Sequence, residues 1–279
     1  MNPQAERPAS RLLTLLALTA GLTVTLFPFL YMLSTALKGQ VYIFEYPPRL
    51  IPAEPTLQNF VKAWTANRFD IYFRNSVVVT VTVTGLVLLL SSLMAYAFAR
   101  FEFRMKRWLY AVILILMMIP AMTLIVPQFM LASRLKLLNS LWGLIVVYTA
   151  QNLPLNTFLL RGFFEQIPVE LEEAALIDGA SAWDVYRRII LPLSKPALAT
   201  VAIFASLGAW DEYVWAMTIL NQADKRTLPV GIATFHGVHA TDWGLVFAAS
   251  LIAIVPILIL FVLLQRYFIK GAITGAIKG

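Results

Sequence analysis

Two adjacent acids are the first candidates for chemistry, because they interrupt a long stretch that otherwise carries no charge. Asp211 and Glu212 lie within the block 196–220, whose other residues are uncharged. On insertion scales an acid at the centre of a membrane helix costs roughly 2.5 to 3.5 kcal/mol. We therefore expect the two acids to face a bundle interior, an aqueous cavity or the outer interface, and acids in such places commonly have a function.

Aromatic residues beside these acids indicate what the site would bind. Trp210 and Tyr213 flank the acids, and Trp215 follows two residues later. Each side chain has a flat apolar face and a polar tip, and such a surface suits a sugar ring. The sequence thus predicts a sugar pathway built from Trp210, Tyr213 and the two acids. The alternative is an interfacial aromatic belt with the acids at the lipid headgroups.

A second polar cluster lies in the apolar block 137–160. Gln151, Asn152 and Asn156 surround Pro154 there. Proline lacks a backbone N–H and disturbs the helix before it, and nearby polar side chains can satisfy the freed backbone groups. The three amides are therefore candidates for lining the pathway and, equally, for satisfying a broken helix.

The sequence contains no motif typical of a catalytic or metal site. The chain has no cysteine, which excludes thiol nucleophiles, disulfides and iron–sulfur clusters, and its two histidines, His236 and His239, are too few ligands for a metal site. The sequence contains no G-x-x-x-x-G-K-[ST] phosphate loop, no serine elbow and no H-E-x-x-H motif. We predict no catalytic residue, no metal and no cofactor held by this chain.

The composition excludes an ordinary soluble domain. The chain is 59% hydrophobic and only 13% charged, whereas soluble domains are about 25% charged. Its net charge of +7 does not indicate nucleic-acid binding, because the basic residues lie between apolar blocks and form no single stripe. Six apolar blocks exceed the length needed to cross a membrane: 12–37, 75–99, 108–133, 137–160, 196–220 and 243–265. The expected fold is an all-α membrane protein with six transmembrane helices in one transmembrane domain, 1–279.

The short link 100–108 sets the expected orientation. It carries Arg100, Arg104, Lys106 and Arg107, and short basic links lie on the cytoplasmic side. With an even number of spans, both termini are then cytoplasmic. The first apolar run is longer than the roughly 7 to 15 residues of a signal-peptide core, so we expect it to remain as the first span.

The loop 161–195 has the sequence of two short helices. Pro168 fits the first position of a helix, acids follow it in the opening turns, and Gly179 ends it. Ser181, with an acid three residues later, resembles a capping pair. The second helix starts there, and we expect it to stop at Pro192.

The second of these helices is amphipathic and needs a partner. Its apolar face consists of Trp183, Tyr186, Ile189 and Ile190 at helical spacing. The bilayer interface, the chain's own spans and a separate soluble subunit all qualify as the surface that covers it. The residues alone do not choose among the three.

The same loop carries a spaced signature. Glu173-Ala174-Ala175 is followed after three residues by Gly179, after nine more by Ile189, and after one more by Leu191-Pro192. This pattern resembles, at every position, the Glu-Ala-Ala loop of permease subunits of bacterial ABC importers. Its surroundings look like the carbohydrate-importing branch, and effectively the whole chain is similar to the smaller permease of maltose-type importers.

The resemblance implies a coupling helix that sits in a cleft of a cytoplasmic ATPase subunit and transmits its movement to the spans. Small alanines permit the close approach that such docking requires. The resemblance implies that the residues that contact the ATPase are Glu173, Ala174, Ala175, Asp178, Gly179, Ile189, Leu191 and Pro192.

The resemblance also implies a bacterial inner-membrane location and a set of partners. These are a second permease, two ATP-binding cassette subunits that hold the ATP, and an extracytoplasmic solute-binding protein that meets the outer loop 221–242. Membrane lipid surrounds the spans, and no nucleic acid is expected.

One departure from the family leaves the solute open. The family usually has an amide directly after this tryptophan, where the chain has Asp211. We expect ATP-driven import of a sugar or sugar-like solute, with a glycerol phosphate derivative or another small polar solute as the alternative. Two other classes are an ion-driven transporter with Asp211 or Glu212 as proton carrier, and a membrane enzyme using both acids with His236.

Overall fold

The computed structural model describes residues 8–39, 46, 49–66, 68–236 and 241–276. Within these ranges the chain is helical, and its one β-type pairing is an isolated bridge between His236 and Thr241. This confirms the all-α prediction. The chain divides into two compact units, residues 1–67 with 232–253 and residues 68–231 with 254–279.

The first unit contains α1 (Pro8–Ala36), α2 (Gln58–Thr65) and the beginning of α13 (Trp243–Ala276). The amide of Asn59 on α2 is buried and donates to the carbonyl oxygens of Ala36, at 2.9 Å, and Lys38, at 2.7 Å. The last carbonyls of a helix have no partner within it. Asn59 therefore satisfies the end of α1 and fixes α2 beside it.

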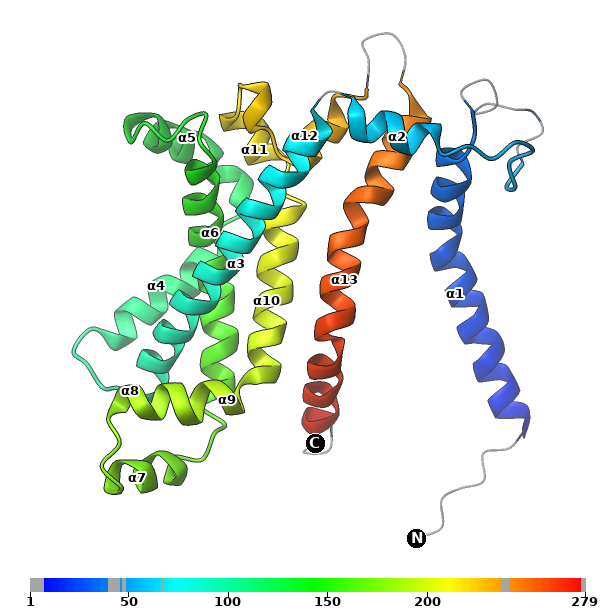
Figure 1. The fold of residues 1–279 in the computed structure, drawn as a ribbon. Helices are drawn as coiled ribbons and strands as arrows, with labels where there is room; N and C mark the ends of the chain where they lie inside the picture. The colour runs from blue at the N-terminus through cyan, green and yellow to red at the C-terminus, as the bar shows by residue number, and fades with distance from the viewer. Residues whose placement is uncertain (1–7, 40–45, 47–48, 67, 237–240, 277–279) are drawn as a thin grey trace. The chain divides into compact units, whose positions relative to one another are not determined.

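Three long helices form the core of the second unit: α3 (Phe69–Arg100), α6 (Leu141–Phe164) and α10 (Lys195–Trp210) (Figure 1). On α3, Val79, Val83 and Val87 recur every four residues and are buried, as expected for one helix face. They belong to the same apolar cluster as Leu144 of α6 and Ala205 of α10.

Shorter elements lie at the two ends of this unit. One end holds α7 (Glu170–Ile177), α8 (Ala182–Val185), the π-helical turn η3 (Tyr186–Ile190) and α9 (Leu191–Leu193). The other end holds α5 (Ile125–Arg134), α11 (Val214–Ile219) and η4 (Ala223–Lys225), and α12 (Leu228–Ala233) follows in the chain.

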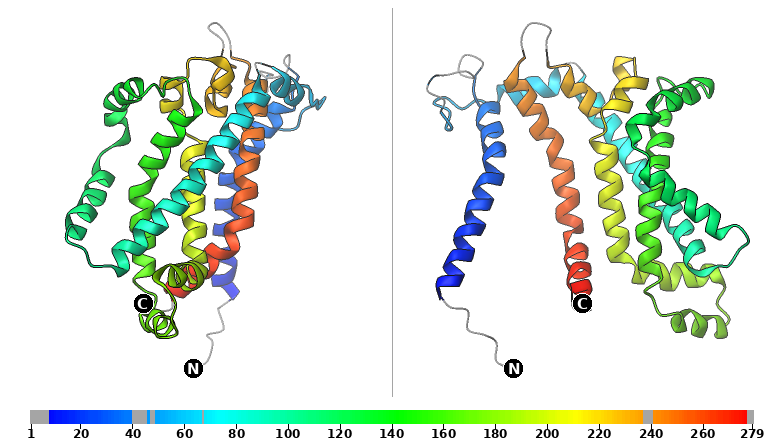
Figure 2. Two further views of the ribbon diagram at one scale, coloured as in Figure 1. Left: turned by 60° about the vertical axis from the view of Figure 1, so that its left-hand side comes forward. Right: turned by 180° about the vertical axis from the view of Figure 1, so that it is seen from behind.

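The expected span 108–133 is not one continuous helix. The structure has α4 (Lys106–Met118), η2 (Ala121–Leu124) and α5, with a bend of 101° (Figure 2). Pro120 causes the break, because a proline ring disfavours helical geometry at the preceding residue. Ile119 is accordingly extended, with φ −86° and ψ 119°.

Three described helices are long and apolar enough to cross a membrane: Arg11–Ala36 of α1, Phe69–Arg100 and Trp243–Tyr267 of α13. Two bent pairs, Lys106–Met118 with Ala121–Arg134 and Ala182–Leu193 with Lys195–Trp210, raise the number to five. The helix α6 is not among these candidates. It has 24 residues, which is long enough, but its amides Gln151, Asn152 and Asn156 reduce its hydropathy. The expected span 196–220 also differs, because α10 ends at Trp210 and α11 begins at Val214.

Replacing Gly143 by alanine should destabilise the second unit, because the added methyl group would collide with the carbonyl oxygen of Leu137. Such overpacking costs about 1 to 3 kcal/mol. Gly162 lies on the same helix with open space beside it, so Gly162→Ala should be neutral or stabilising. Thermal unfolding of the two purified variants in detergent provides the comparison. Equal shifts of Tm would contradict the close approach at Gly143.

Candidate functional site

The first arm of the α6–α10 loop (165–194) is α7, and it ends as its sequence predicts. Gly179 has a φ of +87°, a left-handed conformation that glycine adopts without steric cost. The N–H of Gly179 donates to the carbonyl of Leu176 at 3.0 Å, and that of Ala180 to the carbonyl of Ala175 at 2.9 Å. This pair of bonds is the Schellman motif. It turns the chain sharply without leaving the last carbonyls unsatisfied.

The second arm begins with the predicted capping pair. The hydroxyl oxygen of Ser181 accepts from the backbone N–H of Asp184 at 3.2 Å, and the N–H of Ser181 donates to the carboxylate of Asp184 at 3.3 Å. The Ser181 hydroxyl also donates to that carboxylate at 2.6 Å. These bonds favour the charged form, so they hold the pKa of Asp184 below its usual value.

The expected helix stop at Pro192 is wrong, because the second arm continues through α9 to Leu193. The intervening turn η3 is a π-helix, in which the N–H of Leu191 donates to the carbonyl of Tyr186, five residues back. A wider turn of this kind accommodates a proline, which has no N–H to donate and whose ring crowds the preceding turn. The chain then bends by 78° into α10.

One face of the second arm packs on the chain's own helices. Val185, Tyr186 and Ile190 are buried, and the hydroxyl of Tyr186 forms a hydrogen bond with that of Ser92 on α3 at 2.7 Å. The ring of Tyr96 on α3 lies 5.2 Å from that of Tyr186. The chain's own helices therefore cover Tyr186 and Ile190, two members of the predicted apolar face.

The other side of the loop is exposed and apolar. Five of its exposed large apolar side chains define the loop patch: Val169, Leu171, Leu176, Ile177 and Trp183. Ile177 is 86% exposed and Trp183 is 57% exposed. Exposed apolar patches of this kind mark surfaces that contact another protein or a membrane.

The signature residues of the loop differ in exposure. Glu173, Ala174, Asp178, Gly179 and Pro192 are exposed, whereas Ala175, Ile189 and Leu191 are half-buried. The structure thus brings the first five to the accessible side of the loop.

A buried ion pair below α7 was missed by the sequence analysis. The Nε atom of Arg100, the last residue of α3, lies 2.5 Å from Oε1 of Glu172, and its Nη2 donates to the carbonyl of Ile167 at 2.8 Å. Both side chains are about nine-tenths buried, with exposures of 11% and 8%. The sequence had indicated Arg100 only as a topology signal.

At the opposite end, Glu212 caps α11. Its carboxylate accepts from the backbone N–H groups of Trp215, at 2.7 Å, and Ala216, at 3.0 Å, and from the hydroxyl of Tyr148 on α6. Acids are favourable at a helix N-terminus because its N–H groups lack partners. Glu212 therefore holds the α10–α11 break against α6.

The residues next to Glu212 in the chain lie in different environments. Asp211 is exposed, Tyr213 is half-buried, and Trp210 is buried with its ring at 5.9 Å, edge-to-face, from that of Phe73. The four predicted pathway residues around the break therefore do not present one common surface.

The amides of α6 mostly bond to their own helix. Asn152 donates to the carbonyl of Tyr148 at 2.8 Å, Asn156 donates to that of Asn152 at 2.7 Å, and Gln151 reaches Gln128 of α5 at 3.2 Å. The side-chain oxygen of Asn156 is buried and has no hydrogen-bond partner among the described residues. Backbone satisfaction and pathway lining both stay predictions for these amides.

A cavity of about 240 Å³ lies in the second unit between α3, α10 and α13. Its polar lining comes from Thr80, Thr84, Ser206 and Trp210, and the hydroxyls of Thr84 and Ser206 are 2.9 Å apart. These hydroxyls were not identified from the sequence, although hydroxyls within apolar blocks are a usable signal.

The segment 224–228 is attached to the first turns of α3. The amide of Asn75 donates to the carbonyls of Asp224 and Arg226, each at 3.0 Å, and the hydroxyl of Ser76 accepts from the N–H of Leu228 at 2.8 Å. The described residues contain no group of three His, Cys, Asp or Glu side chains that could hold a metal ion. His239 lies outside the described residues.

Comparison with known proteins gives a family match. Residues 87–273 match the model of the binding-protein-dependent transport system inner membrane component. The trehalose/maltose transport system permease protein MalG of Thermococcus litoralis is 35% identical over 277 residues, 98% of this chain and 99% of that protein. The arabinooligosaccharides transport system permease protein AraQ of Halalkalibacterium halodurans is 34% identical over 92% of each chain.

The fold is also known from a solved structure. A bacterial ABC transporter involved in the import of the acidic polysaccharide alginate has a chain with a TM-score of 0.83. The match covers 96% of this chain and 99% of that one at 23% identity. It shows the fold.

The two adjacent acids should respond differently to neutralisation. Glu212→Gln leaves an amide where three donors converge, and hydrogen bonds to charged groups contribute about 1.5 to 3 kcal/mol each. We expect a clear loss of thermal stability in detergent. Asp211→Asn, at the exposed neighbour, should leave Tm nearly unchanged. A larger loss for Asp211→Asn than for Glu212→Gln would contradict the capping role.

Proposed function

The chain belongs to the binding-protein-dependent transport system inner membrane component family, and we propose that it forms the import pathway for a sugar or sugar-like solute together with a second permease. It is a multi-pass inner-membrane permease of an ABC importer, and its relatives are transport permeases, not enzymes. We propose, in addition, which solute it carries, how the importer is assembled, how the chain crosses the membrane and which residues dock.

The exposed side of the α6–α10 loop carries this proposal. The loop patch offers apolar contact area, Ala174 permits close approach, and the exposed carboxylate of Glu173 is free of the buried pair that its neighbour Glu172 forms. Apolar anchors beside a charge that can pair with an arginine or lysine are typical of protein interfaces. We infer that this side docks in the cytoplasmic ATPase, with Ala175, Asp178, Gly179, Ile189, Leu191 and Pro192 supporting it.

The shape of the loop favours docking without rearrangement. The Schellman turn at Gly179 and the capping pair at Ser181 satisfy the ends of both arms. A binding surface that is already ordered loses little entropy when its partner arrives. The same order lets the loop pass a displacement to the helices that it contacts.

For the topology we propose six spans in one transmembrane domain, 1–279, with both termini in the cytoplasm. The spans are α1, α3, the bent pair α4 and α5, α6, α10 and α13. The basic link 100–108 and the α6–α10 loop then share the cytoplasmic side, which agrees with the positive-inside rule.

The names of the relatives support a carbohydrate cargo. Besides the trehalose/maltose and arabinooligosaccharide permeases, the sulfoquinovosyl glycerol transport system permease protein SmoH of Agrobacterium fabrum is 37% identical over 91% of this chain and 89% of its own. We propose that the solute passes near Asp211 and the hydroxyls of Thr84 and Ser206. Gln151, Asn152, Asn156, Trp210, Glu212 and Tyr213 stay as pathway candidates. A glycerol phosphate derivative is the alternative cargo.

The proposed assembly has two ATP-binding cassette subunits, which hold the ATP, and an extracytoplasmic binding protein. The outer loop 221–242 is the proposed contact for that protein. Attachment of segment 224–228 to Asn75 and Ser76 supports this, because it gives the loop a fixed base.

Uptake should depend on ATP and not on an ion gradient. In proteoliposomes that contain the chain with its companion subunits and binding protein, labelled maltose, trehalose or an arabinooligosaccharide should accumulate only when ATP is supplied. Addition of a protonophore should leave the rate unchanged, because ATP hydrolysis drives import in the proposed assembly. Glu212, one of the two candidate proton carriers, is already held by three donors. Uptake that stops with the protonophore and continues without ATP would assign the chain to the ion-driven class.

Gly179→Val should uncouple the importer without preventing its assembly. Valine in the left-handed region costs roughly 1 to 2 kcal/mol, which shifts the loop about tenfold away from its docking shape. We expect normal membrane insertion, continued ATP hydrolysis and uptake reduced by about that factor. Gly162→Val is the matched control, since Gly162 is exposed and lies outside the loop. Normal uptake by Gly179→Val would refute the docking assignment.

A further inference from the structure

The ion pair between Arg100 and Glu172 differs from three other ion pairs of the described residues. Lys106–Glu102, Arg161–Glu165 and Arg188–Asp184 join residues four apart and have at least one well-exposed partner. Arg100 and Glu172 are 72 positions apart and are both buried. Exposed pairs contribute little, whereas removing one partner of a buried pair leaves an uncompensated charge.

Arg100 holds the first arm of the loop at two points. Its Nε bonds to the carboxylate of Glu172 in the first turn of α7, and its Nη2 donates to the carbonyl of Ile167, just before that turn. The guanidinium is planar, so its donors keep a fixed relative direction. The two bonds together therefore set both the position and the orientation of α7 against the end of α3.

The second arm is attached to the same helix. The hydroxyl of Tyr186 bonds to that of Ser92 at 2.7 Å, and the hydroxyl of Tyr96 donates to the carbonyl of Ala182 at 3.4 Å. Both arms of the α6–α10 loop thus contact the last three turns of α3.

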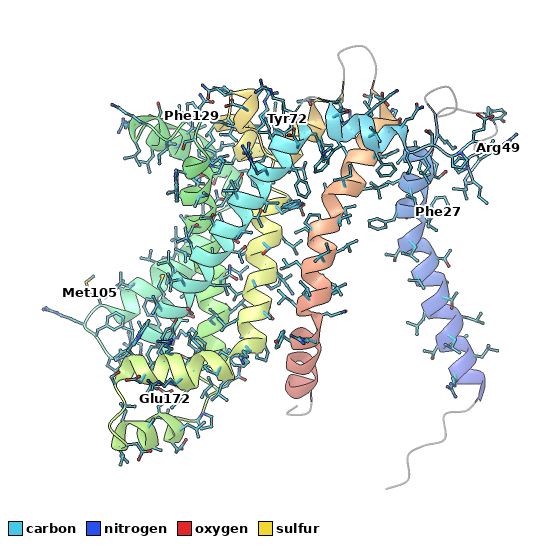
Figure 3. The ribbon with its side chains drawn as sticks, in the orientation of Figure 1. Phe27, Arg49, Tyr72, Met105, Phe129 and Glu172 are labelled. Carbon is cyan, nitrogen blue, oxygen red and sulfur yellow. The ribbon has the colours of Figure 1, made fainter. Side chains whose placement is uncertain are left out.

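The first turns of α3 hold the segment 224–228 through Asn75 and Ser76. One uninterrupted helix, Phe69–Arg100, therefore contacts the loop at one end and this segment at the other. Figure 3 labels Glu172 at one end of the unit and Tyr72, on the first turn of α3, at the other.

We propose that Arg100 and Glu172 are positioning residues that make the α6–α10 loop and α3 move as one body. A displacement of the loop by the ATPase then reaches segment 224–228 through α3. In the reverse direction, a binding protein that contacts this end moves the loop against the ATPase through the same helix and so changes ATP hydrolysis. The proposal rests on the proposed function and adds the residues that transmit the movement.

The test uses the whole reconstituted complex and three variants, Glu172→Gln, Arg100→Ala and Arg100→Lys. Three quantities are measured: basal ATP hydrolysis, its stimulation by solute-loaded binding protein, and solute taken up per ATP. For Glu172→Gln and Arg100→Ala we expect near-normal basal hydrolysis, while stimulation and uptake per ATP fall by about fivefold or more. Arg100→Lys keeps the charge and should recover part of the loss.

Glu102→Gln and Lys106→Met provide matched controls, because they break a pair in the neighbouring link whose acid is exposed. Both should behave like the unmodified complex. Unchanged stimulation and uptake per ATP in Glu172→Gln and Arg100→Ala would overturn the proposal. Loss of assembly in all three variants, Arg100→Lys included, would also overturn it, since the pair would then serve folding alone.

The unmodified complex separates this inference from the proposed function. If it shows no ATP-dependent uptake, the proposed function fails whatever the variants do. If it transports normally and the variants keep the same uptake per ATP, the function stands and only the role of the pair is refuted.

Discussion

A loop can transmit force only if it keeps its shape when a partner presses on it. The α6–α10 loop meets this requirement because its inner side is held by buried contacts while its outer side is exposed. Arg100 and Tyr186 fix the two arms to α3, and the left-handed Gly179 joins the arms through a satisfied turn. The exposed side, with Ile177 at its most accessible point, is then presented in one conformation.

At the opposite end of the second unit, other partly buried contacts also fix a break between helices. Two acids placed in an apolar block would be costly in a continuous membrane helix, and the structure avoids this cost by ending α10 at Trp210. Glu212 becomes the cap of α11 and the acceptor for Tyr148, while Asp211 remains exposed. The pathway that we propose here would have one accessible carboxylate, and the hydroxyls of Thr84 and Ser206 line a cavity of the same unit.

Features that depend on neighbouring residues could be predicted from the sequence, and features that depend on distant ones could not. The two arms of the loop were predicted because proline, acids, glycine and a capping serine act within a few positions. The apolar blocks were found by composition, which did not predict that helices end inside them at Met118 and Trp210. The pairs Arg100–Glu172 and Tyr148–Glu212 join residues 72 and 64 positions apart, and only the packing of α3, α6 and α10 brings them together.

The most direct test of the central claim asks what the loop patch touches in the assembled importer. A photo-crosslinking amino acid at position 177, in complexes purified from native membranes, should form an adduct with the ATP-binding subunit. The same group at position 142, an exposed tryptophan at the other end of α6, should form none. Crosslinking of position 177 to lipid, or to no nucleotide-binding chain at all, would contradict the account.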